Sequence, residues 1–178
     1  LAFLDADTLV AEGWNAWMQA HLSPGHFYRR GLVREIRDAE THGAVVCRRD
    51  DFLRVEGYDE LYRGWGGEDE DLYQRLAVAG VAEREFDSGL IRAISHGDED
   101  RAGWEGLRSR RDMIDLCACY RMAKVNTLQL LHRTGELPFD LRRQFLANTR
   151  QSLEPWFHSG RKTAHVMRYD VELDGDHI

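Results

Sequence analysis

The sequence has no long hydrophobic run and few cysteines, and each absence excludes a class of protein. No apolar stretch approaches the roughly 20 residues of a membrane-spanning helix, and no segment resembles a signal peptide, so we expect no transmembrane segment. The three cysteines, Cys47, Cys117 and Cys119, are odd in number and lack the spacing of a metal site or a disulfide framework. We therefore expect reduced thiols and a cytoplasmic location.

The chain also has no excess of basic residues. Its formal net charge is -7, whereas proteins that bind a phosphate backbone usually present a basic face, so we expect no nucleic-acid partner. The 178 residues, of which 43% are hydrophobic, are enough to form one globular domain with a real core.

The most unusual stretch combines bare backbone, one large aromatic and four consecutive carboxylates. It reads Gly64-Trp65-Gly66-Gly67-Glu68-Asp69-Glu70-Asp71. The glycines permit close approach of another molecule to the main chain, and the acidic run opens a predicted helix over residues 68–79. Acidic side chains in a first helical turn also interact favourably with the helix dipole, so a simple charge cap is the alternative interpretation. That alternative leaves Trp65 unexplained, and a flat aromatic beside carboxylates is a common way to hold a sugar ring.

A second acidic element follows the first predicted strand. Residues 1–4 are apolar and lead directly into Asp5 and Asp7, which would face the same side if the backbone stays extended. The pair is a weak signal alone, since a turn or helix cap is then the better explanation, but open α/β sheets keep ligands at the carboxyl ends of strands. Another predicted strand, residues 90–95, delivers His96, a third candidate ligand for a cation.

Hydrophobic patterning predicts an alternation of strands and helices in the first hundred residues. We expect helices over 9–21, 48–55 and 68–79, and strands over 27–36, 43–47, 81–86 and 90–95. Trp14, Trp17 and Met18 are expected in the core. The later residues predict helices over 109–132 and 139–153, followed over 162–174 by an edge strand or a disordered end.

Taken together, these segments resemble a known enzyme family. Residues 5–7, 48–60 and 64–72, and a strand ending in His96, are similar in order and spacing to the C-terminal half of a glycosyltransferase of the type A fold. The β-1,4-galactosyltransferase and chondroitin-polymerase-like group is the most similar. The resemblance implies an α/β fold, the nucleotide-diphospho-sugar transferase (GT-A, Rossmann-like) fold, with residues 1–101 as the metal- and acceptor-binding half and 102–178 as a helical extension.

The same resemblance implies a metal-dependent transfer with inversion at the anomeric carbon. A sugar of the galactose or N-acetylhexosamine class would pass from a nucleotide-diphosphate donor, a UDP-sugar, to a saccharide hydroxyl. Asp69 corresponds to the general base, and Trp65, Glu68, Asp69 and Glu70 to acceptor contacts. Asp5, Asp7, Gly66 and Gly67 correspond to donor contacts, and Asp7 and His96 to metal ligands.

The metal set departs from the family at one position. The galactosyltransferases place a sulfur ligand three residues before the histidine, where this chain has Ala93. Histidine with carboxylates favours Mn²⁺, with Mg²⁺ as the alternative.

Two other functions are compatible with the sequence. One is an inactive sugar- or nucleotide-binding module of the same fold, and the other is a divalent-cation-binding domain without sugar chemistry. Because the acidic pair follows the first strand, we also expect an upstream half of the domain, and we expect the apolar edge of residues 1–4 to promote self-association.

Overall fold

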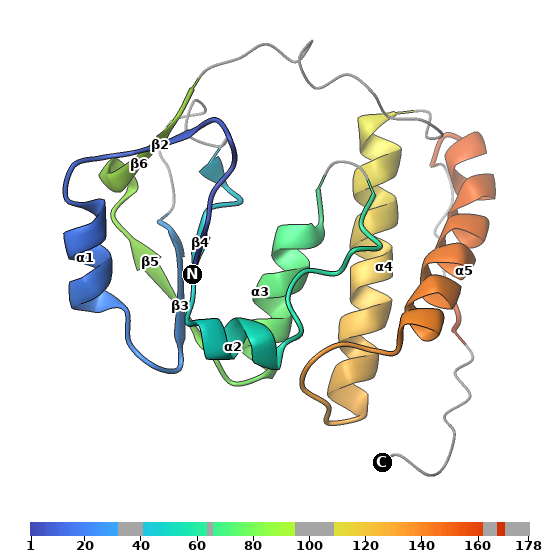
Figure 1. Cartoon of the computed structure of the whole chain (residues 1–178). Helices are drawn as coiled ribbons and strands as arrows, with labels where there is room; N and C mark the ends of the chain where they lie inside the picture. Colours follow the sequence, from blue (N-terminus) through green and yellow to red (C-terminus); the bar gives the residue numbers. More distant parts are fainter. Residues whose placement is uncertain (32–40, 64–65, 95–108, 162–166, 170–178) are drawn as a thin grey trace. The chain divides into compact units, whose positions relative to one another are not determined.

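The structure of the chain is a computed structural model that describes residues 1–31, 41–63, 66–94, 109–161 and 167–169 (Figure 1). It forms two compact units. The first comprises Leu1–Gly57 and Leu76–Gly103, and the second comprises Tyr58–Arg75 and Trp104–Ile178. The predicted domain boundary at residue 101 stays a prediction.

The first unit contains a mixed four-stranded sheet in the order β1-β4-β3-β5. Its strands are β1 (Ala2–Phe3), β4 (Val45–Val46), β3 (His26–Arg30) and β5 (Ala82–Phe86). β4 runs antiparallel to both neighbours, while β3 and β5 are parallel, with His26 opposite Ala82. Parallel neighbours need a crossover connection, and α3 (Glu68–Val78) leads into β5. The predicted α/β class with a mixed sheet is therefore confirmed.

A separate two-stranded sheet corrects the predicted helix over residues 9–21. β2 (Thr8–Val10) pairs antiparallel with β6 (Ile91–Ala93), with Thr8 opposite Ala93. The helix α1 (Trp14–His21) begins only after Gly13, whose φ of 92° reverses the chain direction. The prediction was wrong because the periodicity of Trp14 to His21 was extended into a segment whose backbone bonds to a distant strand.

Aromatic and aliphatic side chains from α1 and the sheet form the core of the first unit. Its buried members are Trp14, Met18, Tyr28, Ala44, Val46, Phe86 and Ile91. Trp14 meets Phe86 edge to face with ring centroids 5.3 Å apart, and Trp17 packs on the cluster from a half-buried position. The prediction that these tryptophans belong to the core is confirmed.

The shorter predicted elements agree with the structure. α2 (Arg49–Arg54) ends at the buried Val55. α3 ends at Gly80, whose φ is +78° and whose N–H donates to Ala77 O, while Val81 N donates to Leu76 O at 2.9 Å. β3 ends at Arg30, and the remainder of the strand predicted to residue 36 falls on residues 32–40, outside the described residues.

Two helices dominate the second unit. α4 (Arg110–Leu130) confirms the helix predicted over 109–132. Ser109 precedes it, and the Ser109 hydroxyl accepts from the N–H of Asp112. α4 and α5 (Phe139–His158) pack against each other (Figure 1). A hydrophobic cluster stabilises this unit, with buried members Tyr120, Leu128, Leu137 and Phe145. No described helix combines the length and apolar character needed to cross a membrane.

α5 continues past the predicted end at Leu153. Pro155 lacks an N–H and removes one helical hydrogen bond, yet the helix runs to His158, and Ser159 N donates to Pro155 O at 3.0 Å. The guanidinium of Arg161 lies 5.3 Å from the centroid of Trp156 and holds this last turn. Most of the predicted tail element, residues 162–174, lies outside the described residues.

Candidate functional site

The acidic motif forms the first turn of α3, as predicted. Glu68, Asp69 and Glu70 are half-buried, and Asp71 is fully buried. Trp65, which the sequence associates with a sugar ring, lies outside the described residues. The four carboxylates of the motif therefore divide into three that are half-buried and one that is fully buried.

The half-buried carboxylates have neighbours from two other segments. The hydroxyl of Tyr58 donates to Oδ1 of Asp69 at 3.3 Å. A guanidinium nitrogen of Arg121, on α4, lies 3.9 Å from Oε2 of Glu70. Asp69, the predicted base, is thus a carboxylate at a helix N-terminus that accepts a hydrogen bond from a neighbouring tyrosine.

The two glycines of the motif have different surroundings. Both have positive φ, +89° at Gly66 and +101° at Gly67. A Cβ added to Gly67 would lie 2.7 Å from Cβ of Cys117 and 3.0 Å from a ring carbon of Tyr62. No atom of the described residues lies within 4 Å of the same position on Gly66. Gly67 therefore allows close packing within the protein itself, and Gly66 leaves room for another molecule.

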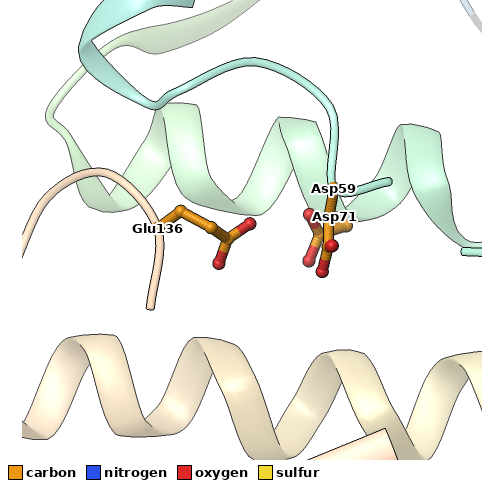
Figure 2. Close-up of side chains that lie close together, drawn as sticks. All are labelled: Asp59, Asp71 and Glu136. Atoms are coloured by element: carbon orange, nitrogen blue, oxygen red, sulfur yellow. The ribbon is translucent and has the colours of Figure 1, made fainter. Parts of the chain in front are cut away.

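Three buried carboxylates, one of which is Asp71 of the motif, lie close together. Asp59, Asp71 and Glu136 each place a carboxylate oxygen within 4.8 Å of the other two (Figure 2). They come from the turn after α2, from α3 and from the connection between α4 and α5. In geometry alone the group resembles a metal site.

The side chain of Lys124 supplies the cation for this group. Its ammonium lies 2.7 Å from Oδ2 of Asp59, 2.7 Å from Oδ1 of Asp71 and 2.8 Å from Oε2 of Glu136. Lys124 is itself completely buried. The three carboxylates are therefore ligands of an ammonium group, and they give no support to a metal ion at this position.

Two arginines balance the remaining charge. Arg75 bonds Asp71 at 2.7 Å and lies 3.4 Å from Glu136. Arg142 Nη1 lies 2.5 Å from Oδ1 of Asp59. Three cations thus face three carboxylates in one cluster, which we call the buried ion network. The hydroxyl of Tyr120 donates to Asp59 at 2.6 Å and adds a neutral donor.

The pKa values of two carboxyl groups in the network shift in opposite directions. Burial raises the pKa of Asp59, but the charge and hydrogen bond of Lys124, with help from Tyr120, outweigh it and hold the pKa below its usual range. Burial also raises the pKa of Glu136, and there Lys124 and Arg75 do not fully offset it. The network therefore favours the ionised form of Asp59 more strongly than that of Glu136.

The acidic pair Asp5 and Asp7 occupies a turn in the first unit. Thr8 N donates to Asp5 O at 2.9 Å, which closes a turn between β1 and β2. The expectation of an extended pair is therefore wrong, and the alternative of a turn is correct. Ile94 N donates to Asp7 O at 2.7 Å, so Asp7 lies beside the end of β6. His96 follows two residues later and is outside the described residues.

The predicted site residues consequently fall into two groups. Gly66, Glu68, Asp69 and Glu70 belong to the second unit, and Asp5 and Asp7 belong to the first. Sequence reasoning missed Tyr58, Lys124 and the structural part of Asp59 and Asp71. A lysine at position 124, four residues after Tyr120 and four before Leu128 on one apolar helix face, was the available signal.

Comparison with known proteins finds one segment that is similar to galactosyltransferases. A family described as "N-terminal domain of galactosyltransferase" matches residues 34–97. β-1,4-Galactosyltransferase 2 of Homo sapiens is 38% identical over 61 residues, which cover 33% of this chain and 16% of the relative. β-1,4-Galactosyltransferase 1 of Bos taurus is 34% identical over 61 residues, 33% of this chain and 15% of the relative.

A longer match has lower identity. The β-N-acetyl-D-glucosaminide β-1,4-N-acetylglucosaminyl-transferase of Lymnaea stagnalis is 27% identical over 122 residues, 62% of this chain and 24% of that protein. The alignments thus cover about a quarter or less of each of these relatives. No solved structure matches the chain significantly. The predicted resemblance to β-1,4-galactosyltransferases is confirmed for the matched segment, and it supports a glycosyltransferase.

The different surroundings of the two glycines give a first prediction. Gly67→Ala should destabilise the protein by about 3 kcal/mol or more, because the new Cβ meets the rigid Cβ of Cys117 in addition to the cost of positive φ. Gly66→Ala is the matched control and should cost only the backbone strain, about 1 to 2 kcal/mol. Urea unfolding of both variants measures the difference, and equal losses would contradict the packing assigned to Gly67.

The pKa directions in the buried ion network give a second prediction. A carboxyl group with a lowered folded pKa stabilises the fold above its unfolded pKa, and that contribution disappears as pH falls through the folded value. A group with a raised pKa contributes stability only at low pH and loses it as pH rises through the folded value. At pH 7 the fold therefore depends on ionised Asp59 more than on ionised Glu136.

Two isosteric variants test this order. Asp59→Asn should cost about 3 to 5 kcal/mol at pH 7, the usual range for removing one partner of a buried pair. Glu136→Gln resembles the protonated form and should cost clearly less. The penalty of Asp59→Asn should begin to shrink below about pH 4, where the unfolded chain gains the proton, and should disappear only below the lowered pKa of the folded carboxyl. Urea unfolding at several pH values measures both; an equal or larger penalty for Glu136→Gln would refute the assignment.

Proposed function

We propose, from the galactosyltransferase segment at residues 34–97, that the protein is a metal-dependent inverting glycosyltransferase of the type A fold. It would move a sugar of the galactose or N-acetylhexosamine class from a UDP-sugar to a saccharide hydroxyl. The relatives are named as β-1,4-galactosyl- and β-1,4-N-acetylglucosaminyl-transferases, and these names support this substrate class. The observation that carries the proposal is Asp69 in the first turn of α3, inside the matched segment.

The reaction needs a base at the acceptor. An acceptor hydroxyl is a poor nucleophile until a carboxylate removes its proton while the oxygen attacks the anomeric carbon. The new carbon–oxygen bond forms as the bond to the diphosphate oxygen breaks, and the attack from the opposite face inverts the centre. Asp69, half-buried at a helix N-terminus, has the chemical type and the partial exposure for this step.

The neighbouring residues would bind the acceptor. Glu68 and Glu70 flank Asp69 and offer carboxylate oxygens to sugar hydroxyls, and Trp65 would stack on a sugar ring. Gly66 has open space at its Cα and would allow the donor to approach the main chain. Gly67 packs against Cys117, so its contribution to donor binding would be indirect.

Asp5 and Asp7 would serve the donor and its metal ion. A carboxylate pair with a histidine suits Mn²⁺, and Mg²⁺ is the alternative. Asp7 is half-buried, and its carbonyl accepts from the N–H of Ile94 at the end of β6. A bound ion would act as a Lewis acid for the leaving diphosphate. Asp5 would contact the donor's ribose or sugar. A cytoplasmic location remains part of the proposal.

The role of Asp69 leads to the first functional prediction. In the full-length protein that carries this chain, Asp69→Asn should reduce turnover by roughly 10²-fold or more and leave donor binding nearly intact, because only proton removal is lost. Transfer from UDP-galactose and UDP-N-acetylglucosamine to a β-N-acetylglucosaminide, with calorimetry for donor binding, measures both.

Asp140 on α5 provides a matched control. Asp140 is the second residue of its helix, as Asp69 is the second residue of α3. Asp140 is exposed. Asp140→Asn removes the same helix-terminal charge without touching the motif, so it should leave turnover unchanged. Near wild-type turnover in Asp69→Asn would rule out Asp69 as the base.

The metal assignment has a test that does not depend on turnover. If Asp7 and His96 share one ion, Asp7→Ala and His96→Ala should each weaken Mn²⁺ binding, and the double variant should lose much less than the sum. His132→Ala, a change at an exposed histidine, is the control and should have no effect. Strictly additive losses in calorimetric titration would mean that the two residues do not share an ion.

A further inference from the structure

We propose that Tyr58 is a positioning residue for Asp69, and that the ammonium of Lys124 sets their separation by binding the nearby Asp59 and Asp71. The inference deepens the proposed function, since it gives the orientation of the proposed base a structural cause. It assigns a role to Tyr58 and to α4, which the similarity to galactosyltransferases does not describe.

The direct contact is a hydrogen bond between two side chains. The Tyr58 hydroxyl donates to Oδ1 of Asp69 at 3.3 Å, and both residues are half-buried. The bond engages one carboxylate oxygen and thereby restricts rotation of the group. A base must keep its second oxygen aimed at the hydroxyl it deprotonates, so restricting this rotation favours reactive geometry.

The residue after Tyr58 is firmly anchored. Asp59 is only 3% exposed and receives bonds from Lys124 at 2.7 Å and from the Tyr120 hydroxyl at 2.6 Å. Its Oδ1 also accepts from the backbone N–H of Leu61 at 3.0 Å, which fixes the turn itself. The backbone that carries the Tyr58 ring is therefore attached to α4 one residue away from it.

The helix turn that carries Asp69 is anchored to the same ammonium. Asp71, two residues later, lies 2.7 Å from Lys124 and 2.7 Å from Arg75. Tyr58, Asp59, Asp69, Asp71 and Lys124 all belong to the second unit. Lys124 therefore binds both Asp59, which follows Tyr58, and Asp71, which lies two residues after Asp69. The distance between Tyr58 and Asp69 depends on this common attachment point.

Other roles for Tyr58 do not explain the arrangement as well. A purely structural tyrosine would direct its hydroxyl to a buried group, as Tyr62 does in donating to Oδ1 of the buried Asp71 at 3.3 Å. Tyr58 instead bonds a half-buried carboxylate in the part of the motif proposed to bind the acceptor. The two tyrosines therefore provide a natural comparison.

The experiment removes one hydroxyl from each tyrosine in the full-length protein. Tyr58→Phe should lower kcat roughly 10-fold, the scale of one hydrogen bond to a charged group, while KM for the UDP-sugar stays close to wild type and Tm falls only slightly. Tyr62→Phe loses a bond of equal length to a structural carboxylate, so it should lower Tm by a few degrees and leave kcat per folded molecule unchanged. A fall in Tm without a fall in kcat for Tyr58→Phe would show a structural role and overturn the inference.

A second measurement needs no substrate. The unfolding free energies of Tyr58→Phe, Asp69→Ala and the double variant form a cycle. Each single change removes the Tyr58–Asp69 bond, so the loss in the double variant should be smaller than the sum of the two single losses. Strict additivity would overturn the inference. If the cycle shows coupling but Asp69→Asn leaves turnover unchanged, the proposed base is wrong and the contact stands. If Asp69→Asn abolishes turnover but Tyr58→Phe leaves kcat intact, only the positioning role falls.

Discussion

The second unit depends on one ammonium group. Lys124 is fully buried and lies within 2.8 Å of carboxylates from three separate segments. An isolated buried charge is very costly, so the arrangement persists only because Arg75 and Arg142 complete the charge balance and hydrogen bonds occupy the remaining oxygens. Such a network adds little net stability compared with an apolar core, but it allows few alternative arrangements because each partner is required. It therefore defines where the turn at Asp59 and the start of α3 lie.

The acidic motif consequently performs two tasks within one helical turn. Glu68, Asp69 and Glu70 remain half-buried, whereas Asp71 turns inward to Arg75 and Lys124. The run is therefore more than a simple charge cap, because Asp71 binds two buried cations. Close spacing has a physical benefit, since a carboxylate one or two residues from a rigid anchor loses little entropy when it is oriented.

The sequence predicted local structure well where a pattern had one explanation. The apolar run before Cys47, the helix over Glu68 to Val78 and the glycine that ends it are all local signals, and the structure agrees with them. Leu9 and Val10 were misassigned to a helix because their strand character comes from pairing with Ile91 and Arg92, more than eighty residues away. The partners of Asp59 were unreadable for the same reason: its cation, Lys124, is separated from it by 65 residues. Long-range pairing of charges leaves no periodic trace in a single sequence.

The location of that cation bears on how the motif is built. The matched segment ends at residue 97, but the charges of Asp59 and Asp71 are neutralised in part from α4, beyond it. Cys117, Arg121 and Lys124 are spaced i, i+4 and i+7 on one face of this helix, and they lie against Gly67, Glu70 and Asp71 in turn. A helix face that follows a motif residue by residue must keep a fixed register with it. The C-terminal helices are therefore part of the structure that holds the motif, even though the similarity to known galactosyltransferases is strongest before them.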